Sequence, residues 1–116
     1  VKSVMKVLES IEVKGIVHIT GGGFYENIPR ILPENVDAHI ELGSWFIPEI
    51  FRLIQAQGGI EDNEMFKTFN MGIGMMLVVS QDDVEQTLGI LEEEGEKVYR
   101  IGKIQRGKKQ VVLCQE

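Results

Sequence analysis

Three consecutive glycines, Gly21 to Gly23, are the feature of this sequence with the clearest potential for chemistry. They follow a stretch rich in β-branched residues, Val13 to Thr20, and precede a short segment, Phe24 to Ile28, that we expect to be helical. Between a strand and a helix, successive backbone N–H groups can converge on an anion, and phosphate is the obvious candidate. The alternative is a flexible turn without a ligand. Glycine content alone does not separate the two, because no P-loop or dinucleotide-binding pattern is complete.

Polar residues on either side of the glycines extend the candidate site. Thr20 could offer its hydroxyl to the same anion or cap the helix that follows, and capping is the commoner role. Asn27 and Arg30 lie one turn further on, within reach of polar ligand groups, although a solvated surface would explain them equally well. His18 falls in an apolar strand, where a core histidine is more common than a catalytic base.

A second cluster with glycines runs from Phe69 to Met75. Gly72 and Gly74 alternate within an expected strand, Met71 to Val79, and would leave one face of it bare. Close packing of a helix or strand is the default explanation, and the approach of a ligand is the alternative. Asn70, at the entrance of this strand, is expected to hold the loop or to touch a substrate.

The rest of the sequence indicates neither a metal site nor an activated nucleophile. The acidic run Glu92 to Glu94 lacks the spacing of metal ligands and falls at a helix end, so we interpret it as solvated surface. Cys114 has no cationic neighbour in the sequence that would activate its thiol. We therefore predict no metal ligand in this chain, and we assign no catalytic residue.

Helices and strands are expected to alternate along the chain. Val1, Val4, Met5 and Leu8 share one stripe of a first helix, and Ile50, Leu53 and Ile54 form the inner face of a helix that begins at Pro48 and ends at Gly58-Gly59. The other expected elements are helices at Asp62–Thr68 and Ser80–Gly95 and strands at Val13–Thr20, Val36–Leu42, Met71–Val79, Val98–Ile104 and Gln110–Cys114. The last two strands are expected to pair as a hairpin through Arg106-Gly107-Lys108. An α+β domain follows, with a mixed β-sheet and helices packed mainly on one face.

Composition limits the classes of function. With 116 residues, 43% apolar and 26% charged, the chain is expected to form one compact domain. The net charge of −6 and the scattered basic residues argue against nucleic-acid binding. No apolar run approaches the roughly 20 residues that cross a bilayer. The single cysteine fits a reducing compartment, and we expect a cytoplasmic protein.

Three motifs resemble signatures of one enzyme family. The run from His18 to Arg30, followed by Leu32-Pro33, closely resembles a signature of aminoimidazole ribonucleotide synthetases, also called phosphoribosylformylglycinamidine cyclo-ligases. Phe69 to Met75 is similar to a second signature, and Tyr99-Arg100-Ile101-Gly102 to a third, weaker one. Their order and spacing fit over nearly the whole chain.

The resemblance implies a two-domain, homodimeric enzyme of purine biosynthesis. Its substrate is formylglycinamidine ribonucleotide, and its amino-terminal domain carries most of the ATP and Mg²⁺ site. Residues 1–116 would be part of the carboxy-terminal domain, truncated at its N-terminal side, with the ATP-binding domain absent. Such a piece alone is expected to be inactive, and it is expected to bind neither nucleic acid nor membrane.

Carried over residue by residue, the family's glycine loop falls on Thr20, Gly21, Gly22 and Gly23, which would hold the ribose 5′-phosphate. Asn27 is the next expected substrate contact. His18, Arg30 and Asn70 occupy motif positions near the cleft. Two alternatives remain: a paralogous enzyme (formylglycinamidine synthetase, selenophosphate synthetase or thiamin-phosphate kinase), or a non-catalytic module that binds anions or assembles with other domains.

Overall fold

The computed structural model describes residues 2–114, which contain five α-helices, two short 3-10 helices and five strands. They divide into two compact units, one formed by residues 2–16 and 77–100 and the other by residues 17–76 and 101–114. The elements, in chain order, are α1 (Lys2–Leu8), β1 (Val13–His18), α2 (Gly23–Asn27), η1 (Pro29–Ile31), β2 (Val36–Glu41), α3 (Glu49–Gly58), α4 (Asp62–Thr68), β3 (Met75–Val79), η2 (Gln81–Asp83), α5 (Val84–Glu93), β4 (Gly102–Arg106) and β5 (Val111–Cys114). The α+β class is confirmed, with two sheets in place of one.

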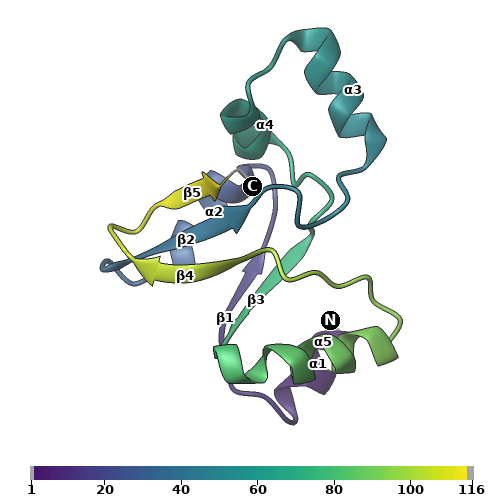
Figure 1. Ribbon diagram of the computed structural model, residues 1–116, viewed down its shortest axis with the longest axis vertical. Coiled ribbons are helices and arrows are strands. Elements are labelled where there is room, and N and C mark those ends of the chain that lie inside the picture. The colour runs from purple at the N-terminus through teal and green to yellow at the C-terminus, as the bar shows by residue number, and fades with distance from the viewer. Residues whose placement is uncertain (1, 115–116) are drawn as a thin grey trace. The chain divides into compact units, whose positions relative to one another are not determined.

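The larger sheet has three strands in the order β4-β2-β5 and lies in the second unit (Figure 1). Strand β2 pairs antiparallel with β4, so that Ala38 lies opposite Ile104, and parallel with β5, so that Ala38 lies opposite Val111. The sheet is therefore mixed, as expected. The expected hairpin of the last two strands is wrong, because β2 separates them.

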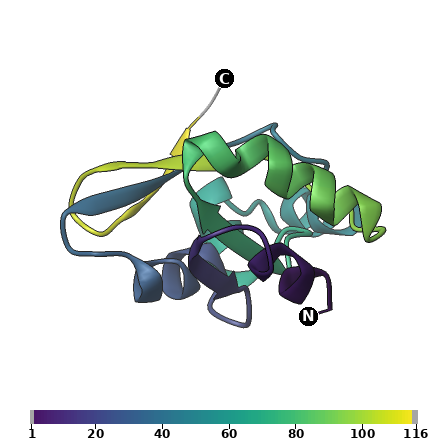
Figure 2. The same ribbon diagram turned by 90° about the horizontal axis from the view of Figure 1, so that it is seen from below.

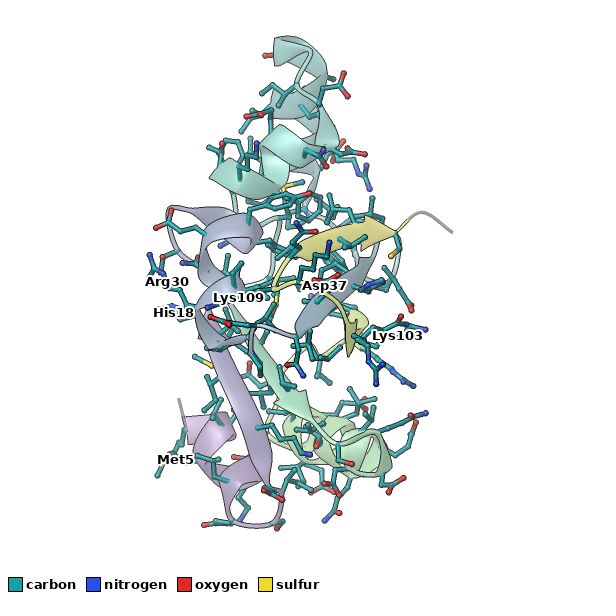
Figure 3. The ribbon with its side chains drawn as sticks, turned by 90° about the vertical axis from the view of Figure 1, so that its left-hand side faces the viewer. Met5, His18, Arg30, Asp37, Lys103 and Lys109 are labelled. Atoms are coloured by element: carbon teal, nitrogen blue, oxygen red, sulfur yellow. The ribbon has the colours of Figure 1, made fainter. Side chains whose placement is uncertain are left out.

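The turn between β4 and β5 crosses the start of β2 and is held there by Asp37. One oxygen of its carboxylate accepts the backbone N–H groups of Lys108, at 2.7 Å, and Gln110, at 2.9 Å. Gly107 donates its N–H to the carbonyl of Asn35 at 2.9 Å, and Figure 2 shows this turn beside the beginning of β2. The same two N–H groups, that of Gln110 first, hold the pKa of Asp37 below its ordinary value. Figure 3 labels Asp37 within this sheet.

Helices α2 and α4 share one buried core with this sheet. Phe24 of α2 packs edge-on against Phe66 of α4, with ring centroids 4.8 Å apart, and Trp45 completes the aromatic cluster. From the sheet, Ala38 and Ile40 join the same buried core. The core of the second unit therefore lies directly beneath the glycine loop that begins α2.

The first unit has a small core of its own, in which α1 and α5 pack together. Its buried residues are Val7, Ile11 and Leu91. The predicted stripe of the first helix is wrong, because Met5 and Leu8 are exposed and Val7 is fully buried; Val1 lies outside the described residues. Val7 is instead the residue of this helix that enters the core, together with Ile11 and Leu91.

Two expectations for the middle of the chain are also corrected. The segment from Met71 to Gly74 is a turn, and only Met75–Val79 is a strand, which pairs with β1 in a two-stranded sheet. Helix α3 has no buried residue, and Ile50 and Leu53 of its expected inner face are exposed. By contrast, α4 spans Asp62–Thr68 as predicted, and Gly59 ends α3 in the left-handed conformation. Within residues 2–114, no helix is both long and apolar enough to span a membrane.

Candidate functional site

The glycine loop is a tight turn that leads from β1 into α2. The N–H of Gly23 donates to the carbonyl oxygen of Thr20 at 2.9 Å, so that Gly21 and Gly22 form the middle of the turn. Gly23 has a positive φ of 64°, and a Cβ at this position would overlap the backbone carbonyl of Phe66 in α4. Glycine is therefore required at position 23 for both reasons.

Asn27 holds the loop from beneath. Its side chain is only 5% exposed, and its Oδ1 accepts the backbone N–H of Thr20 at 2.7 Å. The structure thus aims the oxygen of Asn27 at the loop backbone and gives it a positioning role. A direct contact of Asn27 with a substrate stays a prediction.

The two backbone N–H groups at the tip of the turn make no hydrogen bond within the described protein. Within the part of the chain that the structure describes, neither Gly21 nor Gly22 donates its N–H to a protein acceptor. Gly21 also has open space on its side-chain side, since a Cβ there would meet nothing within 4 Å. Thr20 is exposed, and its hydroxyl lies 3.5 Å from Oδ1 of Asn27, at the limit of a hydrogen bond. The two glycine N–H groups thus have no protein acceptor among the described residues, and the hydroxyl of Thr20 makes only this long contact.

The expected capping role of Thr20 is wrong, because the residue that precedes α2 in the cap position is Gly22, and no side-chain hydrogen bond caps this helix. The carbonyl oxygen of Thr20 accepts the N–H of Gly23 within the turn, and the side chain of Thr20 is exposed.

Glu26 is a neighbour of the loop that the sequence did not single out. A Cβ at Gly22 would overlap the side chain of Glu26, so the carboxylate lies against the turn. Its Oε1 accepts a hydrogen bond from Nη2 of Arg30 at 2.6 Å, and both side chains are more than half exposed. Arg30 therefore neutralises a carboxylate that would otherwise repel an anion at the loop. The signal in the sequence is the spacing of four residues between Glu26 and Arg30, which places them on one helical face.

The second cluster forms another turn closed by an asparagine. Oδ1 of Asn70 accepts the N–H of Gly72 at 2.9 Å, and both Met71 and Gly72 have positive φ angles. The carbonyl of Met71 accepts the indole N–H of Trp45 at 3.0 Å. Asn70 thus holds its own loop, which is one of the two roles expected for it.

The structure brings the two clusters together. The N–H of Ile19, just before the glycine loop, donates to the carbonyl of Gly74 at 2.9 Å. On the other side, Gly23 touches α4, which leads directly into the Asn70 turn. The hydroxyl of Tyr25 also donates to Oδ1 of Asn63 in α4 at 3.0 Å, and partial burial raises the pKa of Tyr25 above its ordinary value.

His18 does not belong to the core, contrary to its expected position. It ends β1 with an exposed side chain, and Figure 3 shows His18 and Arg30 at the margin of the molecule, directed outward. Among residues 2–114, no three His, Cys, Asp or Glu side chains are grouped so that they could hold a metal ion.

Comparisons with known proteins give the site a family context. Residues 1–115 match the family described as AIR synthase related protein, C-terminal domain. The phosphoribosylformylglycinamidine cyclo-ligase of Caldicellulosiruptor bescii is 60% identical over 113 residues, which are 97% of this chain and 33% of that protein. The protein of the same name from Alkaliphilus metalliredigens is 55% identical over 116 residues, all of this chain and 33% of that protein. The chain thus spans about a third of the length of these relatives.

Proposed function

Because this chain belongs to the family of AIR synthase related proteins, as their C-terminal domain, we propose that it holds the substrate phosphate in an ATP-dependent cyclo-ligase. The substrate would be formylglycinamidine ribonucleotide and the product aminoimidazole ribonucleotide. The observation that carries the proposal is the tip of the glycine loop, where the N–H groups of Gly21 and Gly22 have no protein acceptor among residues 2–114 and the adjoining Thr20 is exposed. Charge-assisted hydrogen bonds from such donors are the usual means of holding phosphate.

The reaction assigns the loop a positioning task. ATP transfers a phosphoryl group to the amide oxygen of the substrate, an internal nitrogen attacks the resulting iminophosphate, and phosphate leaves as the ring closes. The ribose 5′-phosphate takes no part in these bond changes. Anchoring it fixes the reacting amide relative to ATP, and such binding energy from a remote group can be used to orient the reacting atoms.

ATP and Mg²⁺ would be bound mainly by the remaining two thirds of a longer polypeptide, since the relatives are about three times as long as this chain. In this proposal residues 1–116 form part of the C-terminal domain of a cytoplasmic homodimer.

A chimeric enzyme tests the proposal. This chain would replace the 113 matching residues of the C. bescii cyclo-ligase, and ring closure would be followed with formylglycinamidine ribonucleotide and ATP. Gly21→Val should raise the KM for the ribonucleotide at least tenfold, because the branched side chain fills the open space in which the phosphate would lie. The KM for ATP should stay within about twofold. Gly89→Ala, an equally open glycine on α5, is the control and should leave both constants unchanged.

The neighbouring carboxylate supplies a change of opposite sign. Glu26→Gln removes a negative charge beside the loop and should lower the KM for the ribonucleotide by about two- to fivefold, since an exposed charge pair is worth up to about 1 kcal/mol. Normal constants for Gly21→Val together with normal constants for Glu26→Gln would rule out phosphate at this loop.

A further inference from the structure

Helix α3 presents large apolar side chains to water. Phe46, just before the helix, is 75% exposed, and Ile50 and Leu53 are 57% and 51% exposed. We call these three residues the α3 surface. Ile50 and Leu53 are three positions apart and therefore share one face of the helix. Figure 1 shows α3 at the outer edge of its unit, beyond α4.

The opposite side of α3 is already attached to its own unit. The ring of Phe51 packs against Phe69, with centroids 5.6 Å apart. Nε2 of Gln55 donates to the carbonyl of Ile60 at 3.0 Å and to Oδ1 of Asp62 at 2.7 Å. These contacts fix the rotation of the helix about its axis, so the outward direction of Ile50 and Leu53 is set by the fold.

The exposure of Phe46 is fixed in a similar way. Its neighbours Trp45 and Ile47 are both buried, so the backbone on either side of Phe46 is anchored to the core. Pro48, two residues after Phe46, packs against Gly72. The α3 surface is thus a preformed feature on anchored backbone.

The area of this surface indicates what covers it. Its exposed fractions correspond to on the order of 400 Å² of apolar surface, within the range of functional patches on proteins. Two copies of this chain joined there would bury roughly 800 Å² in total, less than the approximately 1,200–2,000 Å² of a stable complex between separate proteins. Contacts between domains of one chain typically bury only about 600–1,500 Å², and the covalent connection raises the effective concentration of the two domains.

We propose that the α3 surface docks against the remaining two thirds of a longer polypeptide of the kind found in the cyclo-ligase relatives, whose length is about three times that of this chain. The inference shares with the proposed function only the premise that this chain works as part of such a polypeptide. It does not depend on what the glycine loop binds. The contact would seat this domain on its neighbour through apolar side chains outside the glycine loop.

Thiol labelling of two cysteine variants tests this docking. Leu53→Cys lies in the proposed contact, and Glu34→Cys, in the exposed turn after η1, is the matched control. Each would be labelled with an exposed-thiol reagent in the 116-residue chain and in the chimera with the C. bescii cyclo-ligase, and quantified by peptide mass spectrometry so that Cys114 can stay. We expect labelling at position 53 to slow at least tenfold in the chimera and labelling at position 34 to change less than twofold.

Three results would overturn the proposal. Equal labelling at position 53 in both proteins means that the surface stays in water. Protection that arises in the 116-residue chain and grows with its concentration assigns the surface to a second copy. Equal slowing at positions 34 and 53 means general burial. Two further proteins guard against one misfolded variant. The first is Ile50→Cys, and the second is a chimera with the cyclo-ligase of Caldicellulosiruptor saccharolyticus, which is 61% identical over 113 residues. A failure of both chimeras to fold counts against the docking. A chimera that protects position 53 but closes no ring contradicts the proposed function alone.

Discussion

The glycine loop and the Asn70 turn use one structural device to different ends. In both, an asparagine oxygen accepts a backbone N–H, that of Thr20 in the first and that of Gly72 in the second. In both, a glycine with positive φ packs so closely that a Cβ would collide, at Gly23 with a carbonyl of α4 and at Gly72 with Pro48.

The difference lies in what each turn leaves unused. In the Asn70 turn, the carbonyl of Met71 accepts the indole N–H of Trp45, and Gly72 lies against the ring of Pro48. The polar groups of this turn and its glycine therefore serve packing. The glycine loop leaves Gly21 in open space beside the exposed Thr20. A glycine-rich turn is therefore a candidate binding site only where some of its glycines are not needed by the fold.

The largest effect is expected at the glycines that the fold does need. Gly23→Ala should destabilise the protein by about 3 kcal/mol or more, because a left-handed alanine would also push against the backbone of α4. Gly72→Ala should cost less, because a proline ring can yield more easily than a helix backbone. Thermal unfolding of both variants measures the order. A smaller loss for Gly23→Ala than for Gly72→Ala would contradict the assignment of the tighter packing to the glycine loop.

A middle-sized effect is expected at the two asparagines. Asn27→Ala leaves the N–H of Thr20 without its acceptor in a partly buried setting and should cost about 1–3 kcal/mol. Asn70→Ala acts in a more exposed turn and should cost about 0.5–1.5 kcal/mol. Chemical denaturation of each variant gives the values, and Asn27→Asp, which keeps an accepting oxygen, is the control. Equal losses of unfolding free energy at both positions would show that the partly buried hydrogen bond of Asn27 contributes no more than the exposed one of Asn70.

Local patterns in the sequence predicted much of this arrangement. The glycines fall between a strand and a helix as expected, and the bounds of α4 match the prediction, because caps, breakers and helical spacing act over a few residues. The contacts that the sequence could not predict are the non-local ones. Asp37 binds N–H groups more than 70 positions away, and this clasp carries the last two strands to opposite sides of β2.

Two features of the site were missed for the same reason. The burial of Asn27 beneath the loop depends on how α2 packs, and the position of Glu26 depends on the absent Cβ of Gly22. Neither follows from residue type. For Met71 to Gly74, the apolar run suggested a strand, and the hydrogen bond from Gly72 to Asn70 prevailed over that preference.

A smaller effect, one that depends on pH, is expected at Asp37. Like Asn27 and Asn70, Asp37 holds a turn by accepting backbone N–H groups. Asparagine does not titrate, whereas the two backbone N–H bonds lower the pKa of Asp37 in the folded protein. Asp37 therefore contributes stability above its unfolded pKa of about 3.9, and this contribution is lost as the pH falls through the lowered folded value. The difference in melting temperature between the parent and Asp37→Asn should shrink from pH 7 to pH 3. A constant difference across this range would show that the charge of Asp37 does not stabilise the turn.

The N–H groups of Gly21 and Gly22 are proposed to bind phosphate, and the chemical shifts of these two amides report on that contact. The ¹⁵N-labelled chain would be titrated with ribose 5-phosphate, with ribose as the uncharged control. We predict saturable, downfield shifts at Gly21 and Gly22 with ribose 5-phosphate alone, no saturable change at Gly72 or Gly74, and loss of the response in Gly21→Val. Unchanged amides at Gly21 and Gly22 up to millimolar ligand, or equal responses to ribose, would contradict the claim.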